Sequence, residues 1–393
     1  MQSDNQGFLY PHVNSSLCAE CGRCVDLCPL KHEYVERIPL HTYAVKNSDE
    51  GIRLNSSSGG VFTILAEQII KEGGVVYGAV FDKDWTVKHD RIDKVEDIDK
   101  LRGSKYVQSR MEGIYPNVKK DLNAGLKVLF SGTHCHIAAL FSFLGGTHQN
   151  LITVDVICGG VPSPRIWRDY LKEEIKAFKA AVGNNLVTSS LNDMSCIRDI
   201  SFRNKSNGWK KFRFVLHFIE NPTECNPNIL LPSCDYDIWE HTFMLSWLKG
   251  YISRPACHAC HFRKGRSGAD YTIADYWCVE QNYPKFADDK GVSMFLIYDG
   301  AMPLYMANKC ESIDTKFEHA AYGQRCVLDN HPYNPTSKLY FFLHDRCHFS
   351  LSRTLVICLS VDKGKKLLEQ YRETVKHFMK RIRRFVKRIW QKF

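Results

Sequence analysis

The most constraining feature of the sequence is a run of four cysteines near its N-terminus. Cys18, Cys21, Cys24 and Cys28 occur within eleven residues, and a proline follows the last of them. The spacing C-x2-C-x2-C-x3-C-P is one by which a short loop holds a [4Fe–4S] cluster. Zinc is the alternative, but zinc sites usually combine two separated pairs of ligands. We therefore predict a small ferredoxin-like [4Fe–4S] module over residues 1–45.

The run has no counterpart nearby, because the next cysteine after Cys28 is Cys135. In ferredoxins with two clusters, the fourth cysteine of such a run binds the other cluster. Ligands that complete the set would therefore come from the rest of the chain. The run is predicted to be one half of a redox relay rather than a separate ferredoxin.

From Ser56 onward, helical and extended patterns alternate along the chain. Apolar residues three and four positions apart indicate helices, and short apolar runs between glycines indicate strands. This alternation is typical of an α/β fold with a mixed, largely parallel sheet and flanking helices. The predicted helices are 61–71, 114–123, 134–144, 163–178 and 237–248, and the predicted strands are 75–81, 127–130, 151–157, 198–202, 212–219, 271–274 and 294–298.

Four further cysteines in the α/β body are candidate cluster ligands. Cys135 and Cys158 each follow a predicted strand, where open α/β sheets place their binding sites. Cys257 and Cys260 form a C-x2-C pair. Together with the N-terminal run they make eight cysteines, the number that two [4Fe–4S] clusters require. The run alone predicts one cluster, and the count of eight favours two.

Other chemistry is open to these residues. Cys135 lies at a helix start between two histidines, where a thiol can have a lowered pKa and act as a nucleophile. Cys257 and Cys260 can bind zinc with His258 or His261, or form a redox dithiol. Taken singly, the remaining cysteines are ordinary buried thiols.

The net charge of +10 is concentrated at the C-terminal end of the chain. Residues 362–393 contain twelve Lys and Arg against three Asp and Glu, so +9 lies there and the rest of the chain is nearly neutral. We therefore predict no nucleic-acid partner. The apolar spacing of this tail predicts an amphipathic helix, which can contact a membrane surface peripherally or pack on protein.

Sixteen cysteines in a chain with no visible export signal are not expected to form a disulfide framework. The first residues are polar, and no apolar run reaches the roughly 20 residues that a membrane-spanning helix needs. We expect a cytoplasmic protein.

The order of several motifs resembles the beta-subunit family of coenzyme F420-reducing hydrogenases and dehydrogenases, a group of iron–sulfur flavoproteins. The resemblance extends over roughly residues 10–310. It implies a bound FAD and at least one cluster near it. The motifs are the cysteine run, Ser58-Gly59-Gly60, Gly103-Ser104-Lys105-Tyr106, Ser131-Gly132-Thr133-His134-Cys135, Cys158-Gly159-Gly160-Val161-Pro162-Ser163, residues 254–260 and Asp270–Trp277.

The resemblance also suggests which residues bind the flavin. Ser57, Ser58, Gly59 and Gly60 precede a predicted helix, whose free N–H groups and dipole would form a phosphate cradle. Such a start is otherwise a common helix cap. Lys105 would supply a cation to the pyrophosphate. The predicted set also includes Gly103, Ser104, Tyr106 and Thr133.

Three of these motifs depart from the family pattern. The usual Thr-Pro-Cys-Gln is Thr133-His134-Cys135-His136, the usual Cys-His-Gly is Cys158-Gly159-Gly160, and Cys278 follows the tryptophan of the last motif. Reactivity with coenzyme F420 itself is therefore not carried over.

These features predict an iron–sulfur flavoprotein oxidoreductase that passes electrons between [4Fe–4S] clusters and FAD and acts on a small substrate. A redox partner protein or a small-molecule electron donor is expected. A second hypothesis is an electron-transfer subunit that docks a partner enzyme, and a third is a zinc-binding scaffold without redox function. The predicted domains are the module 1–45, a flavin-binding region 46–183, a C-x2-C region 184–330 and a basic tail 331–393.

Overall fold

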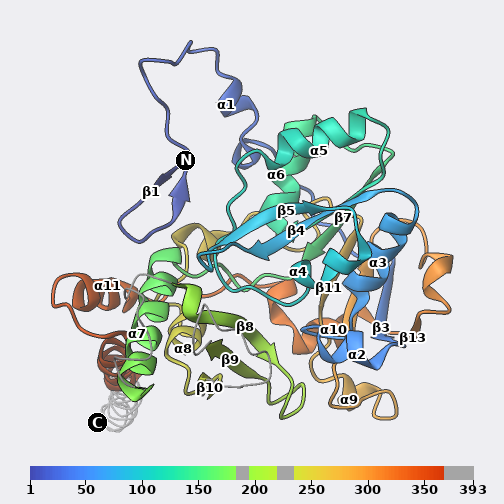
Figure 1. The fold of residues 1–393 in the computed structure, drawn as a ribbon. Coiled ribbons are helices and arrows are strands. Elements are labelled where there is room, and N and C mark those ends of the chain that lie inside the picture. The colour runs from blue at the N-terminus through green and yellow to red at the C-terminus, as the bar shows by residue number, and fades with distance from the viewer. Residues whose placement is uncertain (183–193, 219–233, 367–393) are drawn as a thin grey trace, which may run out of the picture. The chain divides into compact units, whose positions relative to one another are not determined.

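The computed structural model describes residues 1–182, 194–218 and 234–366 (Figure 1). The chain divides into two compact units. The first comprises Met1–Leu245 and Ser253–Tyr333, and the second comprises Ser246–Ile252 and Asn334–Phe393. Every candidate site residue named above belongs to the first unit.

Within the described residues, an eight-stranded mixed sheet forms the body of the first unit. Four adjacent strands, β11, β7, β6 and β4, run parallel to one another, and the other pairs are antiparallel. Sites in such sheets form beyond the carboxyl ends of the parallel strands. The strand order is β13 (Cys310–Asp314), β3 (His41–Asn47), β12 (Ser293–Ile297), β11 (Tyr271–Asp275), β7 (Leu151–Val156), β6 (Val128–Thr133), β4 (Val75–Phe81) and β5 (Val87–Ile92).

Shorter elements complete the described chain. Two smaller antiparallel sheets contain β1 (Gln2–Ser3) with β2 (Leu9–Tyr10), and β8 (Ile197–Asn204), β9 (Arg213–Phe218) and β10 (Cys234–Asp237). The α-helices are α1 (Arg23–Asp26), α2 (Glu50–Leu54), α3 (Val61–Lys71), α4 (Ile98–Leu101), α5 (Ile114–Asn123), α6 (His134–Leu144), α7 (Pro164–Val182), α8 (Thr242–Leu248), α9 (Val279–Asn282), α10 (Phe317–Gly323) and α11 (Ser337–Asp345), and residues 351–366 are also helical.

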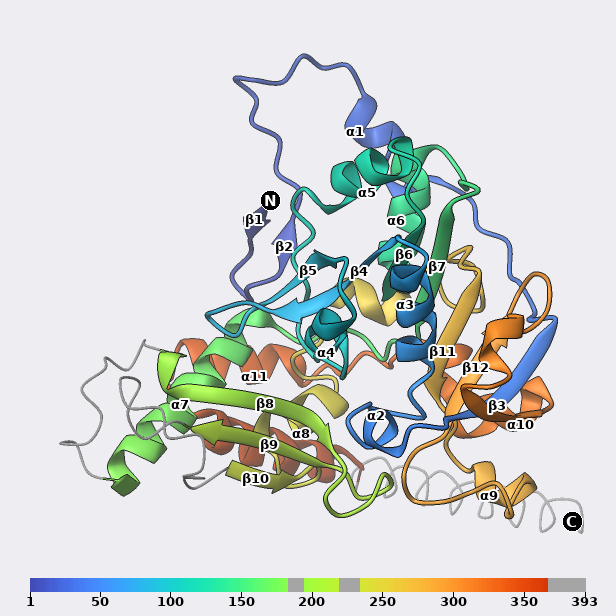
Figure 2. The same ribbon diagram turned by 45° about the vertical axis from the view of Figure 1, so that its right-hand side comes forward.

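Helices cover both faces of the large sheet, because successive side chains of a strand point to opposite faces. Val76 and Leu129 pack with α3 and α4 on one face. Their neighbours Tyr77 and Phe130 pack with α5 and α6 on the other face. In Figures 1 and 2, α3 and α6 accordingly lie on opposite sides of β4. This layering places the start of α6 at the carboxyl end of β6.

The three-stranded sheet packs against α7 through aromatic side chains. Trp167 of α7 lies 5.1 Å from the ring of Phe202 on β8, and Phe178 stacks on Phe218 of β9 at 4.1 Å. Trp167 and Phe202 are almost fully buried. Strand β8 is thereby held firmly enough to serve as a wall of the site described below.

The predicted mixed α/β class is confirmed. The helices α3, α5 and α6 begin and end at the predicted residues, and every predicted strand has a counterpart. The parallel character is confined to the four central strands. Strands β3, β5, β10 and β13 were not predicted, and β3 crosses the predicted domain boundary between residues 45 and 46. The other boundaries stay predictions.

In the second unit, the Asp362 carboxylate collects hydrogen bonds from three side chains. Its Oδ2 accepts from Tyr251 Oη at 2.6 Å and from Asn334 Nδ2 at 3.0 Å, and its Oδ1 accepts from Thr336 Oγ1 at 2.5 Å. None of the described helices is both long and apolar enough to cross a membrane. The predicted amphipathic tail helix lies, beyond residue 366, outside the described residues.

Candidate functional site

A cavity of about 720 Å³ lies beside strands β4 and β5. Its wall consists mainly of these two strands, of residues 55–57 and 102–105, and of residues 199–204 on β8. Cofactor and ligand sites usually occupy roughly 300–1,000 Å³. The cavity is therefore large enough to hold a substantial part of a nucleotide cofactor.

Four of the predicted flavin residues line this cavity, namely Ser57, Gly103, Ser104 and Lys105. Ser57 Oγ accepts hydrogen bonds from Ser104 N–H at 2.8 Å and from Ser104 Oγ–H at 2.9 Å. Gly103 has φ +83°, and a Cβ at that position would meet no atom within 4 Å. The two loops thus meet at one edge of the cavity and leave room above Gly103.

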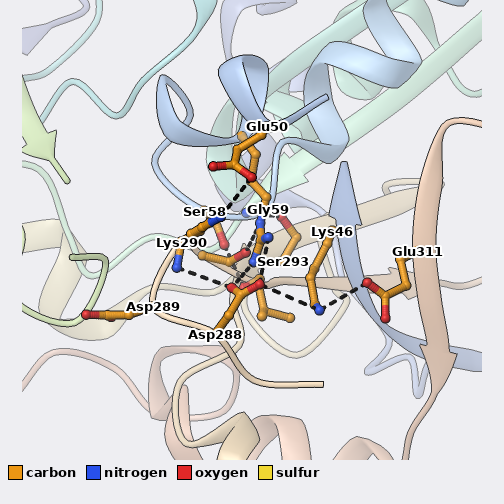
Figure 3. Close-up of polar contacts among 12 residues, drawn as sticks. Lys46, Glu50, Ser58, Gly59, Asp288, Asp289, Lys290, Ser293 and Glu311 are labelled. Atoms are coloured by element: carbon orange, nitrogen blue, oxygen red, sulfur yellow. Dashed lines mark hydrogen bonds and ion pairs between the residues drawn. The ribbon is translucent and has the colours of Figure 1, made fainter. Parts of the chain in front are cut away.

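The glycines that precede α3 pack into the protein instead of lining the cavity. Gly59 N–H donates to Ser293 Oγ at 2.9 Å, and its carbonyl accepts from Asn47 N–H at 2.8 Å. Figure 3 shows Gly59 between Ser58 and Ser293 within this network. A Cβ on Gly59 would lie 2.2 Å from Val45 O. The Gly59 amide is therefore committed to the fold and is not one of the free donors that the cradle hypothesis assigned to it.

We expect Gly59→Ala to lower the free energy of unfolding of the chain by roughly 1–3 kcal/mol, because the added methyl group collides with backbone atoms. Thermal unfolding measured without any flavin checks this expectation. Gly364→Ala is the control, since a Cβ there meets nothing within 4 Å. Equal melting temperatures for the two variants would contradict the clash. A loss of flavin binding in the Gly59 variant would then follow from a displaced loop.

Two buried cations hold the segment 53–60 in place. Lys205 Nζ donates to the carbonyls of Arg53, Ser58 and Lys290 at 2.7–2.8 Å. Arg53 in turn donates to Gly291 O and pairs with Asp288. Burial lowers the pKa of Lys205 to about 7. The loop that carries Ser57 is therefore fixed from behind before any ligand binds.

Further ion pairs extend this support, as Figure 3 shows. Lys46 Nζ lies 3.1 Å from Glu311 Oε2 and 3.7 Å from Asp288 Oδ2. Lys290 Nζ lies 2.7 Å from Glu50 Oε2. Only the Lys290–Glu50 pair is exposed on both sides, and pairs of that kind contribute about 0–1 kcal/mol to stability, whereas Lys46 is buried. We therefore assign them to the scaffold and not to the chemistry of the site.

Lys105 is held by backbone carbonyl groups at the edge of the cavity. Its Nζ donates to the carbonyls of Leu101, Arg102 and Gly103 at 3.0–3.3 Å. No carboxylate pairs with it in the part of the chain that the structure describes. Burial of the ammonium group lowers the pKa of Lys105 to about 7. A cation without a counter-charge in the wall of a cavity favours binding of an anion there.

The four body cysteines come from three separate segments and lie together. Gly160 N–H donates to Cys158 Sγ at 3.3 Å, and a Cβ on Gly160 would lie 3.2 Å from Cys257 Cβ. Burial, followed by the nearby Cys257 and Cys260 thiols, raises the pKa of Cys135 to about 11. The same causes raise the pKa of Cys158, in this case with Cys257 and Cys135 as neighbours. Cys135 is nevertheless accessible to solvent.

The residue types of this group are compatible with an iron–sulfur cluster. An all-cysteine donor set with backbone N–H bonds to sulfur is typical of such clusters. Among the described residues, no three Cys, His, Asp or Glu side chains are placed to hold a metal ion. Zinc at Cys257 and Cys260 gains no support, nor does a nucleophilic Cys135 with a lowered pKa.

The N-terminal run is exposed apart from its last, half-buried cysteine, Cys28. Gly22 has φ +72° and lets the loop turn into α1. Ser142 of α6 donates to Leu27 O at 2.8 Å and lies 3.0 Å from His32 Nε2. Farther on, Arg37 N–H donates to Lys264 O. The run therefore docks on α6, the helix that carries Cys135 in its first turn.

Thr133 and Tyr106, two further predicted flavin residues, do not themselves line the cavity. Thr133 ends β6, and its Oγ1 lies 3.3 Å from Cys135 Sγ, so it belongs with the body thiols. Tyr106 Oη accepts from Arg203 at 3.2 Å. Arg203 lines the cavity and forms a bidentate pair with Asp275 at 2.8 and 3.0 Å. Asp275 falls within a recognised motif, but no sequence signal marked Arg203.

Comparison with known proteins identifies one segment that is similar to a known family. Residues 42–114 match the family described as coenzyme F420 hydrogenase/dehydrogenase, beta subunit N-term. This segment spans β3 to the start of α5 and includes Ser57 and Lys105, and its match agrees with the family resemblance that the motifs suggested. No curated protein matches the chain.

One similar solved structure is a chain of the F420-reducing [NiFe] hydrogenase complex from Methanosarcina barkeri. The two chains are 15% identical, with a TM-score of 0.44. The similarity covers 75% of this chain and 91% of that one.

Proposed function

We propose that this chain is an iron–sulfur flavoprotein oxidoreductase that uses FAD and one or two [4Fe–4S] clusters. The observation that carries the proposal is the gathering of Cys135, Cys158, Cys257 and Cys260 at the carboxyl ends of parallel strands. When bound, the clusters supply single electrons and FAD couples them to two-electron chemistry on a small substrate. The identified family of hydrogenase and dehydrogenase beta subunits supports the oxidoreductase class.

For the flavin, the cavity supplies the features that a dinucleotide requires. Ser57 and Ser104 present hydroxyl groups, Gly103 leaves space for close approach, and Lys105 offers an unpaired cation. We assign the pyrophosphate to this edge of the cavity. The partly exposed aromatic side chain of Phe81, also in the wall, offers a surface for a planar ring.

For electron entry, helix α6 links the two groups of cysteines. Cys135 lies in its first turn, and Ser142 contacts the N-terminal run seven residues later. At 1.5 Å per residue this separation is about 10 Å along the helix. A cluster on the run and a cluster among the body thiols would therefore be close neighbours. We propose that the cluster on the N-terminal run receives electrons from the external donor and passes them to the cluster among the body thiols.

A second candidate function is that of an electron-transfer subunit that docks a partner enzyme. Large apolar side chains around the run are exposed, including Leu17 at 83%, Val35 at 81% and Ile38 at 75%. Apolar surface of this kind beside a redox centre suits a protein partner. Turnover of the isolated chain with artificial donors separates the two candidates, because a pure transfer subunit would reduce no small substrate.

Anaerobic purification followed by measurement of iron, acid-labile sulfide and released FAD tests the proposal. We expect about eight iron and eight sulfide per chain if both cysteine groups hold clusters, and about four if one does. One FAD per chain is expected on denaturation. A colourless chain that contains zinc but neither sulfide nor flavin would refute both redox functions.

A further inference from the structure

Asp155 is a fully buried carboxylate in the middle of the large sheet. On β7 it lies between Gly132 of β6 and Thr272 of β11. Central parallel strands normally carry apolar residues, and burial of a carboxylate costs free energy unless it is well paired. The backbone pairing of β7 does not involve the Asp155 side chain, so the contacts of this carboxylate indicate its role.

A single oxygen of Asp155 joins the three segments that carry the body thiols. Its Oδ2 accepts from His134 Nδ1–H at 2.6 Å and from Ser267 Oγ–H at 2.6 Å. His134 directly precedes Cys135, and Ser267 lies seven residues beyond Cys260. Asp155 itself lies three residues before Cys158. Both partners are buried, with His134 3% and Ser267 1% exposed.

The network is not closed by protein atoms alone. Asp155 Oδ1 and His134 Nε2 are buried and have no hydrogen-bond partner. Most buried polar groups in native proteins do have one, so each exception calls for an explanation. Both orphaned atoms belong to residues within three positions of a body thiol. Unpaired polar atoms at these positions are expected if an additional group binds beside the body thiols.

We propose that Asp155 is the positioning residue of the body thiols, acting through His134 and Ser267 to hold them at the spacing of a [4Fe–4S] cluster. The inference rests on the proposed function, because it concerns the same cluster. Residues that hold metal ligands in place typically change metal affinity 10–100-fold when replaced. Because this role depends on the hydrogen bonds that Asp155 Oδ2 accepts, a substitution that keeps an acceptor oxygen should have a different effect from one that removes it.

The test compares Asp155→Leu with Asp155→Asn in the full-length chain, purified anaerobically. Leucine removes both hydrogen bonds, whereas the asparagine carbonyl oxygen can still accept both. We expect Asp155→Leu to lose the body cluster, so that iron and sulfide fall by about four each, while Asp155→Asn retains them. The visible and EPR spectra of the remaining cluster should be unchanged in both variants.

Asp270→Leu is the matched control. Asp270 Oδ2 also accepts two hydrogen bonds, from Thr153 N–H at 2.8 Å and from Thr153 Oγ1–H at 2.7 Å. These bonds join Asp270 to Thr153 only, and neither residue is next to a cysteine in the sequence. Its variant is expected to melt at a lower temperature and to keep its iron. Equal iron loss in the Asp270 and Asp155 leucine variants would overturn the proposal in favour of general loss of sheet stability.

Ser267→Ala keeps the inference testable if Asp155→Leu does not fold. This variant breaks the bond to Asp155 and the long 3.4 Å bond from Ala269 N–H to Ser267 Oγ, and leaves the His134–Asp155 bond in place. We expect the body cluster to lose iron to a chelator 10–100-fold faster than in the wild-type chain. Loss at the wild-type rate would overturn the inference and leave the proposed function intact. A wild-type chain without iron and sulfide would instead overturn the proposed function.

Discussion

A Cys257→Ser variant is expected to contain about four iron and four sulfide per chain, half of the content expected for a chain with two clusters. Cys257 lies beside Gly160 and interacts electrostatically with Cys135 and Cys158, so it is central to the body thiols. A serine hydroxyl is not ionised near neutral pH and cannot replace a thiolate ligand. Cys24→Ser is expected to remove the other half, because Cys24 belongs to the N-terminal run.

A double variant that combines Cys24→Ser with Cys257→Ser distinguishes two separate clusters from one ligand set that both groups of cysteines share. If each group of cysteines holds its own cluster, the losses add and the double variant contains almost no iron. If the groups share ligands, either single substitution removes most of the iron. Cys347→Ser, at an exposed cysteine outside both groups, is the control and should retain all of it. Full iron retention by Cys257→Ser would contradict a body cluster.

The boundaries of α3, α5 and α6 were predictable because local chemistry marks them, whereas α7 continues to Val182, beyond the predicted end at residue 178, and α8 begins at Thr242, five residues after the predicted start. Helix α3 starts after Gly60, with φ +86°, and α6 ends at Leu144, directly before Gly145, with φ +82°; both glycines have conformations that favour glycine. Apolar residues at helical spacing lie between such marks. The parallel strands β4, β6 and β7 were predictable for a related reason, since each is a short apolar run between helices.

Strand β3 shows why the rest of the fold was not predictable. It pairs with β12, so that Val45 lies opposite Ser293, almost 250 residues later in the sequence. Residues 41–47 carry polar and apolar side chains without clear alternation, because four consecutive residues of the strand are buried. Only the distant partner strands make the segment extended. A pattern confined to the segment contains no information about them.

The candidate site was predictable at the level of motifs and not of contacts. Lys105 was a predicted cation for an anionic ligand, and the structure places it in a cavity wall. The sequence could not indicate that Gly59 packs against Val45, nor that Arg203 pairs with Asp275. Each of these contacts joins positions far apart in the chain, and they arise only when the sheet brings its strands together.

Replacement of Lys105 by methionine is expected to weaken FAD binding at least tenfold at pH 6. The same substitution should abolish most of the pH dependence of FAD affinity that we expect for the wild-type chain. In the free chain the pKa of Lys105 is lowered to about 7 by burial. A pyrophosphate beside the ammonium group would raise that pKa again, so binding takes up a proton above pH 7. Wild-type affinity should therefore be constant below about pH 7 and fall by up to tenfold per pH unit above it.

The sign of this effect follows from which state holds the proton. Below pH 7 both the free and the bound chain carry a protonated Lys105, so no proton is exchanged on binding. Above pH 7 the free chain has lost the proton that the bound chain keeps, and each pH unit adds to the cost of binding. Fluorescence titration of the apo-chain with FAD between pH 6 and 9 measures both quantities. Lys83→Met is the control, because Lys83 is an exposed lysine of the same cavity wall. A wild-type affinity that stays constant from pH 6 to 9, or an equal loss in both variants, would show that Lys105 does not bind the anion.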